Sequence, residues 1–315
     1  MLKLVRRLGL GSPDAPSIPG MQVVDWRILE LPTSNTIIAL CHKDSVLYIT
    51  AYDAKSPPNT NQLTKFSSAV NEMRMDSVDL ANIYPRYTAQ FALYCKKDGA
   101  TAKDVYIKHT RALDVIAAYG MSAVQTSRAS QITAHEASIC DRLGLQPHAN
   151  IAQYLGVQVR DELDFEYKGG KIAVPLAQNS VVGLVFKKYD CTLHEMVIRR
   201  QKIDVKLCLQ SISAAIEHMH YWGVVHGDIR PQNVYVERGF RDHFVVGDFD
   251  CAQDTGSVIA LKTGDSRWSK RKQIGKDTAQ EDDDWSAFRT LMEWLVRETG
   301  GQLVEFKGIG KARVS

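Results

Sequence analysis

An acid, a cation and an amide follow one another closely in the segment 224–236, which reads VVHGDIRPQNVYV. Arg230 comes two residues after Asp228, Asn233 comes five residues after it, and a second acid, Asp248, follows Asn233 by fifteen residues. Phosphoryl transfer depends on positioning and on neutralising charge, and it needs a set of this kind. Asp228 could orient and deprotonate a hydroxyl, while Arg230 could neutralise the transferring phosphoryl group. Asn233 and Asp248 offer the hard oxygen ligands that Mg²⁺ prefers.

The elements next to this segment explain how its side chains could be held. Apolar residues recur at helical spacing over 203–221, which predicts a helix that ends just before the segment. Two short runs, 233–237 and 244–247, predict a hairpin with Asn233 at its start and Asp248 at its end. The sequence therefore places the two candidate metal ligands across one hairpin.

The rest of the chain changes character near residue 190. We expect strands before it, one helix at 124–144 and an exposed acidic loop at 161–170. The expected strands cover residues 36–40, 46–50, 90–95, 104–108, 151–159, 171–174 and 181–186. After residue 190 the pattern is mainly helical, and a last helix is expected at 283–298. A β-rich part followed by a helical part predicts an α+β fold of two lobes with a cleft.

Composition limits the class of protein. The 315 residues are 44% hydrophobic and 24% charged, with 39 basic against 36 acidic side chains, which excludes collagen, coiled coils and wholesale disorder. The near balance of charge gives no reason to expect nucleic acid, and no run of 18 apolar residues predicts a membrane span. Six cysteines stand singly, and the N-terminus has no secretory signal, so we expect a cytoplasmic or nuclear protein.

At this point the sequence resembles the protein kinase family, whose catalytic loop reads H-R-D-L-K-P-x-N and whose metal motif reads D-F-G. Here the corresponding runs are His226–Asn233 and Asp248-Phe-Asp250. The resemblance covers about residues 78–298 and is closest to fungal kinase-like proteins that combine H-G-D-x-R-P with D-F-D. It implies a bilobal protein kinase-like fold, with a β-rich N-lobe and a mainly helical, shortened C-lobe, that binds ATP and Mg²⁺.

The resemblance also implies roles for individual residues. Lys108, in a run similar to V-A-I-K, would hold the nucleotide phosphates, and Glu136 would pair with it. The run 185–189 is similar to the hinge, which implies that Phe186, Lys187 and Tyr189 contact the nucleotide. Further implied roles are catalysis by Asp228 and Arg230, metal binding by Asn233 and Asp248, and structural anchoring by His226 and Asp283.

Four features depart from the family pattern. Residues 77–96, where a glycine-rich loop is expected, contain no glycine, although glycine permits the close backbone approach to phosphates. Gly227 replaces the arginine that precedes the catalytic aspartate, and Asp250 replaces the glycine of D-F-G. No A-P-E motif is found within 264–280, and only 17 residues follow 298.

We therefore expect residues 1–76 to form an N-terminal extension of unknown role and residues 77–315 to form a kinase-like domain, with an N-lobe at about 77–189 and a C-lobe at about 190–315. The leading hypothesis is ATP- and Mg²⁺-dependent phosphoryl transfer to Ser/Thr hydroxyls of proteins. The alternatives are a pseudokinase that acts as a binding or scaffold module, and a small-molecule kinase. A basic run in the segment 267–276 indicates either a solvated loop or a site for an acidic or phosphorylated protein partner.

Overall fold

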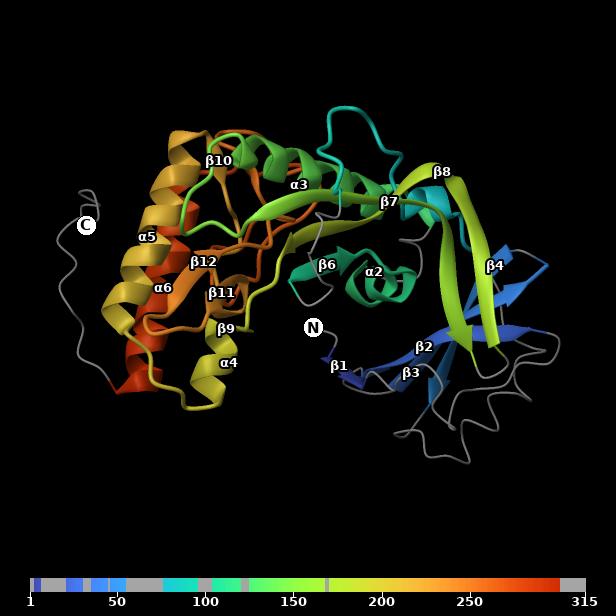
Figure 1. The fold of residues 1–315 in the computed structure, drawn as a ribbon. Coiled ribbons are helices and arrows are strands. Elements are labelled where there is room, and N and C mark those ends of the chain that lie inside the picture. The colour runs from blue at the N-terminus through green and yellow to red at the C-terminus, as the bar shows by residue number, and fades with distance from the viewer. Residues whose placement is uncertain are drawn as a thin grey trace. The chain divides into compact units, whose positions relative to one another are not determined.

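The computed structural model describes residues 3–6, 21–30, 35–44, 46–54, 76–95, 104–119, 125–167 and 170–300. The chain divides into two compact units. The first unit comprises residues 1–94, 107–134 and 157–184, and the second comprises 95–106, 135–156 and 185–315. Helices and strands both contribute, so the predicted α+β composition is confirmed (Figure 1). No helix within the described ranges is long and apolar enough to cross a membrane.

A five-stranded antiparallel sheet forms much of the first unit (Figure 1). Its order is β1 (Lys3–Arg6), β2 (Gln22–Glu30), β3 (Asn35–Lys43), β4 (Val46–Ala54) and β5 (Asp76–Ser77). Strands β3 and β4 pair along their whole length, from Asn35 opposite Ala54 to Lys43 opposite Val46. The expected strands at 36–40 and 46–50 are confirmed and are longer than predicted.

A second sheet and two helices complete the first unit. The sheet has the order β6 (Val105–His109), β8 (Gly170–Lys187) and β7 (Tyr154–Tyr167), and β6–β8 and α3 continue into the second unit. The helices are α2 (Ala112–Tyr119) and α3 (Arg128–Gly144), and the short 3₁₀ turn η2 spans Leu80–Asn82.

The N-terminal sheet shares one hydrophobic core with the elements that follow it. Buried side chains of β2–β4, such as Val24, Ile38 and Leu47, belong to the same cluster as Leu113 of α2 and Val182 of β8. Burial of such side chains is the main favourable term in folding. The described strands of residues 1–54 are therefore an integral part of this unit.

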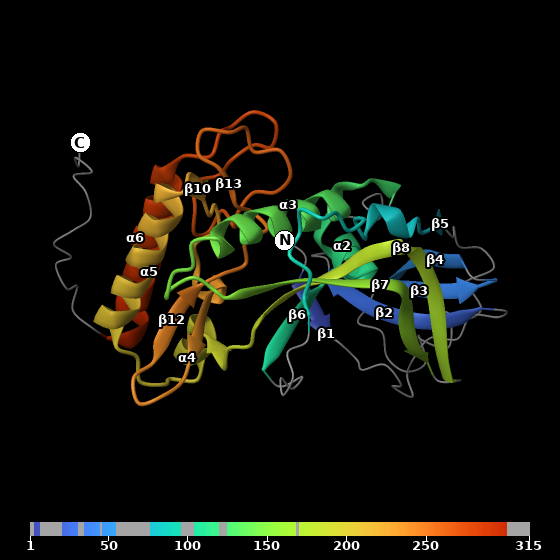
Figure 2. The ribbon, with the colours of Figure 1, turned by 45° about the horizontal axis from the view of Figure 1, so that its top comes forward.

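The second unit contains the elements that surround the segment 224–236. These are β9 (Cys191–Thr192), α4 (Leu193–Ile198), α5 (Val205–Tyr221), β10 (Val224–Val225), η4 (Pro231–Asn233), β11 (Val234–Glu237), β12 (His243–Val246), β13 (Gln253–Asp254) and α6 (Glu281–Thr299). Helices α5 and α6 pack side by side in both views (Figures 1 and 2). The predicted helix at 203–221, the hairpin and the last helix are confirmed to within two residues at each end.

Two expected elements differ from the structure. The predicted acidic loop at 161–170 is wrong, because β7 continues to Tyr167 and β8 begins at Gly170. Leu163 and Phe165 alternate with charged residues there, and this period of two is the pattern of a strand with one covered face. The predicted strand at 90–95 is also wrong, since only Leu93 forms an isolated bridge, to Val157.

Candidate functional site

Asp228, the predicted catalytic aspartate, is buried. It is 3% exposed and lies between β10 and η4. Its Oδ2 accepts a hydrogen bond from Asn233 Nδ2 at 3.0 Å, and its Oδ1 accepts one from the backbone amide of Asp265 at 2.8 Å. Arg230 Nε lies 3.0 Å from Oδ2 as an ion pair whose geometry is not that of a hydrogen bond. A carboxylate has about four acceptor positions, so part of its capacity remains for a further donor.

Asn233 joins Asp228 to the hairpin. Its Nδ2 also donates to the backbone carbonyl of Asp228 at 2.9 Å, which leaves its amide oxygen as the end that could bind a metal. Val234 pairs with Val246, and the Gly247 amide donates to the Asn233 carbonyl at 3.0 Å. The hairpin therefore brings Asn233 beside the residue that precedes Asp248, as the sequence predicts.

His226 fixes the start of the same loop. Its Nδ1 accepts the backbone amide of Asp228 at 3.2 Å, so its Nε2 carries the proton that is donated to the Gly247 carbonyl at 3.1 Å. The ring is fully buried and tilted against Phe249, 5.4 Å between centroids. His226 thus connects the loop before Asp228 with the run that carries Asp248.

Asp284, the fourth residue of α6, holds this loop from the other side. Its two oxygens accept the backbone amides of His226 and Gly227, each at 2.8 Å, and Oδ2 also lies 2.8 Å from His220 Nε2. The prediction that Asp283 anchors the loop is therefore wrong by one residue. Asp283 instead accepts the Gln280 amide at 2.9 Å at the start of α6 and pairs with Lys272 at 2.8 Å.

Three carboxylates converge near the D-F-D run. Oxygens of Glu136, Asp248 and Asp250 all lie within 4.8 Å of one another, with Glu136 buried and the two aspartates partly buried. Asp248 adopts a φ of 68°, a left-handed conformation that few residues other than glycine adopt. Hard oxygen ligands in such a group fit Mg²⁺. Asp250 also forms an ion pair with Lys262, so the aspartate that replaces glycine connects the group to the following segment.

The segment 262–265 lies directly on the loop 226–233. A Cβ added to Gly264 would meet the Gly227 carbonyl oxygen at 2.1 Å, and one added to Gly227 would meet the Cys251 carbonyl oxygen at 2.9 Å. Gly227 also has a φ of 74°. Both positions need glycine, because two backbone segments approach one another more closely than any side chain permits. No arginine fits at position 227 in this arrangement.

Most of the basic run is neutralised within the chain. Arg267 pairs with Asp265, Lys270 with Asp282 at 2.6 Å, and Lys272 with Asp283. The bond from Arg267 is the main reason that the pKa of the Asp265 carboxyl lies below its usual range. Arg271 and Lys276 are exposed to solvent. The basic side chains of this segment thus pair with carboxylates of the segment itself and of the start of α6.

The predicted nucleotide-binding residues are divided between the two units. Lys108 lies on β6 in the first unit, whereas Glu136 lies on the part of α3 that belongs to the second, and their pairing stays a prediction. Phe186 is buried, with its ring centroid 5.5 Å from that of Tyr154. Lys187 donates to both oxygens of Glu237 at 2.7 and 2.8 Å, and the Tyr189 hydroxyl accepts the Gln153 amide at 3.0 Å.

Comparison with known proteins gives local similarities. A Wee1-like protein kinase of Arabidopsis thaliana is 26% identical over 74 residues, which is 24% of this chain and 14% of that protein. A Wee1-like protein kinase of Oryza sativa subsp. japonica is 35% identical over 60 residues, which is 19% of this chain and 11% of that protein. The sporulation protein kinase mde3 of Schizosaccharomyces pombe is 32% identical over 104 residues, and the match covers 29% of this chain and 18% of that protein.

The chain contains a segment similar to protein kinases. It spans between 11% and 18% of the length of these curated relatives. No protein-family model matches it. A crystal structure of the yeast RNA Pol II CTD kinase CTDK-1 complex overlaps 53% of this chain and 51% of that chain, with a TM-score of 0.36 and 15% identity.

The sequence reasoning missed two members of the site. Asp284 could have been found from helical phase, because Phe288, Leu291 and Leu295 stand four, seven and eleven residues after it, on the buried side of α6. Asp265 had no such signal, since its contact with Asp228 is made through a backbone amide across 37 residues of chain.

Proposed function

We propose that this protein is a divergent protein kinase-like phosphotransferase that transfers a phosphoryl group from ATP to Ser/Thr hydroxyls of proteins. The observation that carries the proposal is the bond from Asn233 to Asp228, made at the end of a hairpin whose other strand leads to Asp248. The local similarity to protein kinases supports it. A bilobal arrangement and a cytoplasmic or nuclear location are parts of the same proposal. So is the extension at 1–76, whose described strands pack into the core of the first unit.

Each residue has a proposed task. Asp228 accepts the proton of the acceptor hydroxyl, and Asn233 keeps its carboxylate in place. Arg230, ion-paired with both Asp228 and Asp265, neutralises charge on the transferring group. Glu136, Asp248 and Asp250 would hold Mg²⁺, with Asn233 as a further oxygen ligand, and the ion would supply charge neutralisation on the phosphates. Lys108, Phe186, Lys187 and Tyr189 are kept as proposed nucleotide contacts.

A thermal-shift titration with ATP and Mg²⁺ is the first test, because a ligand that binds only the folded state raises the melting temperature. We expect a saturable rise, and transfer of phosphate to a peptide library. Asp228→Asn should abolish transfer and keep most of the thermal shift. Glu217→Gln, which changes an exposed carboxyl group on α5, is the matched control and should retain both. Transfer that survives Asp228→Asn would remove Asp228 from catalysis.

The second candidate function is that of a pseudokinase, a binding module without catalysis. The observation that favours it is the burial of Asp228. This side chain is 3% exposed and accepts a hydrogen bond from the backbone of the segment 262–265. Residues 77–95 add to it, because they form η2, turns and bridges, and contain no glycine for close contact with phosphates. If millimolar ATP and Mg²⁺ produce neither a thermal shift nor phosphate transfer, the result favours the pseudokinase over the phosphotransferase.

A further inference from the structure

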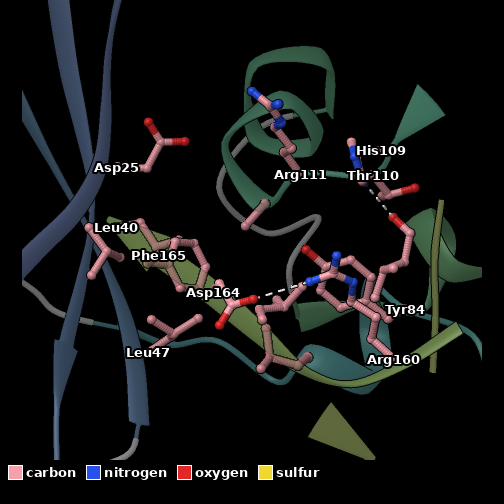
Figure 3. A pocket seen from close by; sticks show the side chains of 15 residues that line it. Asp25, Leu40, Leu47, Tyr84, His109, Thr110, Arg111, Arg160, Asp164 and Phe165 are labelled. Atoms are coloured by element: carbon pink, nitrogen blue, oxygen red, sulfur yellow. Dashed lines mark hydrogen bonds and ion pairs between the residues drawn. The ribbon is translucent and has the colours of Figure 1, made fainter. Parts of the chain in front are cut away.

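A cavity of about 330 Å³ lies within the first unit (Figure 3). It is bounded by the sheet of β2–β4, by the β6–α2 junction and by β7, and none of the predicted nucleotide-binding residues lines it. Pockets of this size with mostly apolar walls and a few polar groups are the usual form of a small-molecule site. Figure 3 shows Leu40, Leu47 and Phe165 grouped on the side of the sheet, with Tyr84 and Arg160 on the opposite side.

The cavity contains hydrogen-bond donors that the protein does not use. Tyr84 is only 6% exposed, and no described residue forms a side-chain hydrogen bond with it. Burial, together with the nearby Asp114 carboxylate, raises the pKa of Tyr84, so its hydroxyl keeps its proton. Arg111 is partly buried at the α2 end of the cavity and forms no ion pair with the described residues. A donor or cation that faces a largely apolar cavity gains a favourable hydrogen bond when an acceptor binds there.

The start of α2 adds a third attraction for negative charge. Ala112 is the first residue of this eight-residue helix and lines the cavity, together with Thr110 and Arg111. The Arg111 carbonyl accepts the first helical bond, from Val115, at 3.0 Å. The first amides of a helix have no partner inside it, and the helix dipole is positive at this end.

The other charged groups of the lining have partners within the chain or carry no charge. Arg160 pairs with Asp164 at 3.2 Å, and Asp25 accepts the Trp26 amide at 2.9 Å. His109 lies 3.3 Å from the Val182 carbonyl through Nδ1, and burial lowers its pKa, so it adds no charge at neutral pH. Among the described lining residues, Arg111 is therefore the cation whose charge is left for a ligand.

We propose that this cavity binds a small organic carboxylate with an apolar body, whose carboxylate contacts the Tyr84 hydroxyl and the start of α2 while its body packs on Leu40, Leu47 and Phe165. Arg111, whose side chain lies along α2 (Figure 3), turns inward to meet the bound carboxylate. The site is independent of the proposed phosphotransfer, because no residue with a proposed role in phosphotransfer or nucleotide binding lines the cavity. A bound ligand would connect the N-terminal sheet with α2 and β7, and so would stabilise this unit against unfolding.

The test uses three probes with the same phenylbutyl body on the full chain: phenylbutanoate, phenylbutanol and phenylbutylamine. Isothermal titration calorimetry should show saturable binding of the carboxylate, with the alcohol and the amine about 10-fold weaker or more, as expected for the loss of a charged hydrogen bond. Equal binding of the three probes, or no binding of the carboxylate at millimolar concentration, would overturn the proposal without using any variant.

Variants then assign the contacts. Arg111→Gln should weaken the carboxylate about 10-fold or more and leave the alcohol unchanged, and Tyr84→Phe should weaken the carboxylate about 3-fold to 10-fold. Arg86→Gln changes an exposed arginine of the same unit that does not line the cavity, and it should change nothing. Carboxylate binding that is unaffected by Arg111→Gln in a folded variant would also overturn the proposal.

Discussion

The carboxylate of Asp284 accepts the backbone amide of Gly227 at 2.8 Å, and this bond connects the first turn of α6 to the loop that carries Asp228. The second oxygen accepts the amide of His226. Asp284 is fully buried, and amide and imidazole nitrogens surround its carboxyl group. The position of the candidate catalytic aspartate therefore depends on a residue 56 positions away.

Asp284→Asn should destabilise the protein much more than Asp283→Asn. An asparagine keeps one acceptor oxygen and turns an NH₂ group toward the second amide, which leaves a buried donor without an acceptor. We expect a loss of about 2–4 kcal/mol in the free energy of unfolding. Asp283→Asn removes the ion pair with Lys272 and changes a helix cap, for about 1 kcal/mol. Urea unfolding followed by circular dichroism measures both, and equal losses would contradict the anchoring role of Asp284.

Gly264→Ala should displace the segment 262–265 from the loop 226–233. The added Cβ would lie 2.1 Å from the Gly227 carbonyl oxygen, which neither backbone can accommodate. Overpacking of this kind costs about 1–3 kcal/mol. Gly144→Ala is the matched control, because nothing lies within 4 Å of its Cβ position and its φ is ordinary. Limited proteolysis should cut the 262–280 segment faster in Gly264→Ala alone, and identical cleavage in both variants would refute the close contact.

Asp265 should make the free energy of unfolding depend on pH, and Asp265→Asn should remove that dependence. Its pKa is lowered mainly by the bond from Arg267, so the folded state favours the ionised carboxylate. The stabilisation is complete above the unfolded pKa of about 3.9 and is lost as pH falls through the lower folded value. Asp265→Asn should therefore be less stable than the parent at pH 6, and the difference should shrink below about pH 4. Urea unfolding at both pH values checks this, and a difference independent of pH would count against the pairing.

Glu136→Gln should weaken binding of a divalent cation. Its carboxylate lies within 4.8 Å of those of Asp248 and Asp250, so the variant removes one hard, charged ligand of three. We expect the affinity for Mn²⁺, measured by electron paramagnetic resonance, to fall about 10-fold or more. Glu217→Gln should leave it unchanged. Equal affinity in Glu136→Gln would show that Glu136 is not a ligand.

Sequence patterns predicted the elements of the second unit well. Helix α5 and the hairpin of β11 and β12 are set by local periodicity, and their ends lie within two residues of the prediction. The bond from Asn233 to Asp228 was not itself predicted, although both residues stand on one short segment. Local patterns are informative where the contacts themselves are local.

The remaining features depend on contacts that local patterns do not contain. The approach of Gly264 to Gly227 joins segments 37 residues apart, and nothing in either neighbourhood indicates the other. The extension of β7 through 161–167 was misinterpreted because its charges suggest a loop, whereas its strand character rests on Leu163 and Phe165 covering the core of the first unit. Tertiary packing overrides local polarity at such places.

The shared core of the first unit has a consequence for synthesis on the ribosome. Strands β2–β4 emerge first, but the cluster that buries Val24 and Leu47 also needs Val174 and Val182, more than 120 residues later. At about 5–20 residues per second, the early strands wait several seconds or more with their apolar faces in water. During that interval the uncovered apolar face and the free edges of the sheet are prone to aggregate. The nascent chain should therefore bind holding chaperones until β8 has left the exit tunnel.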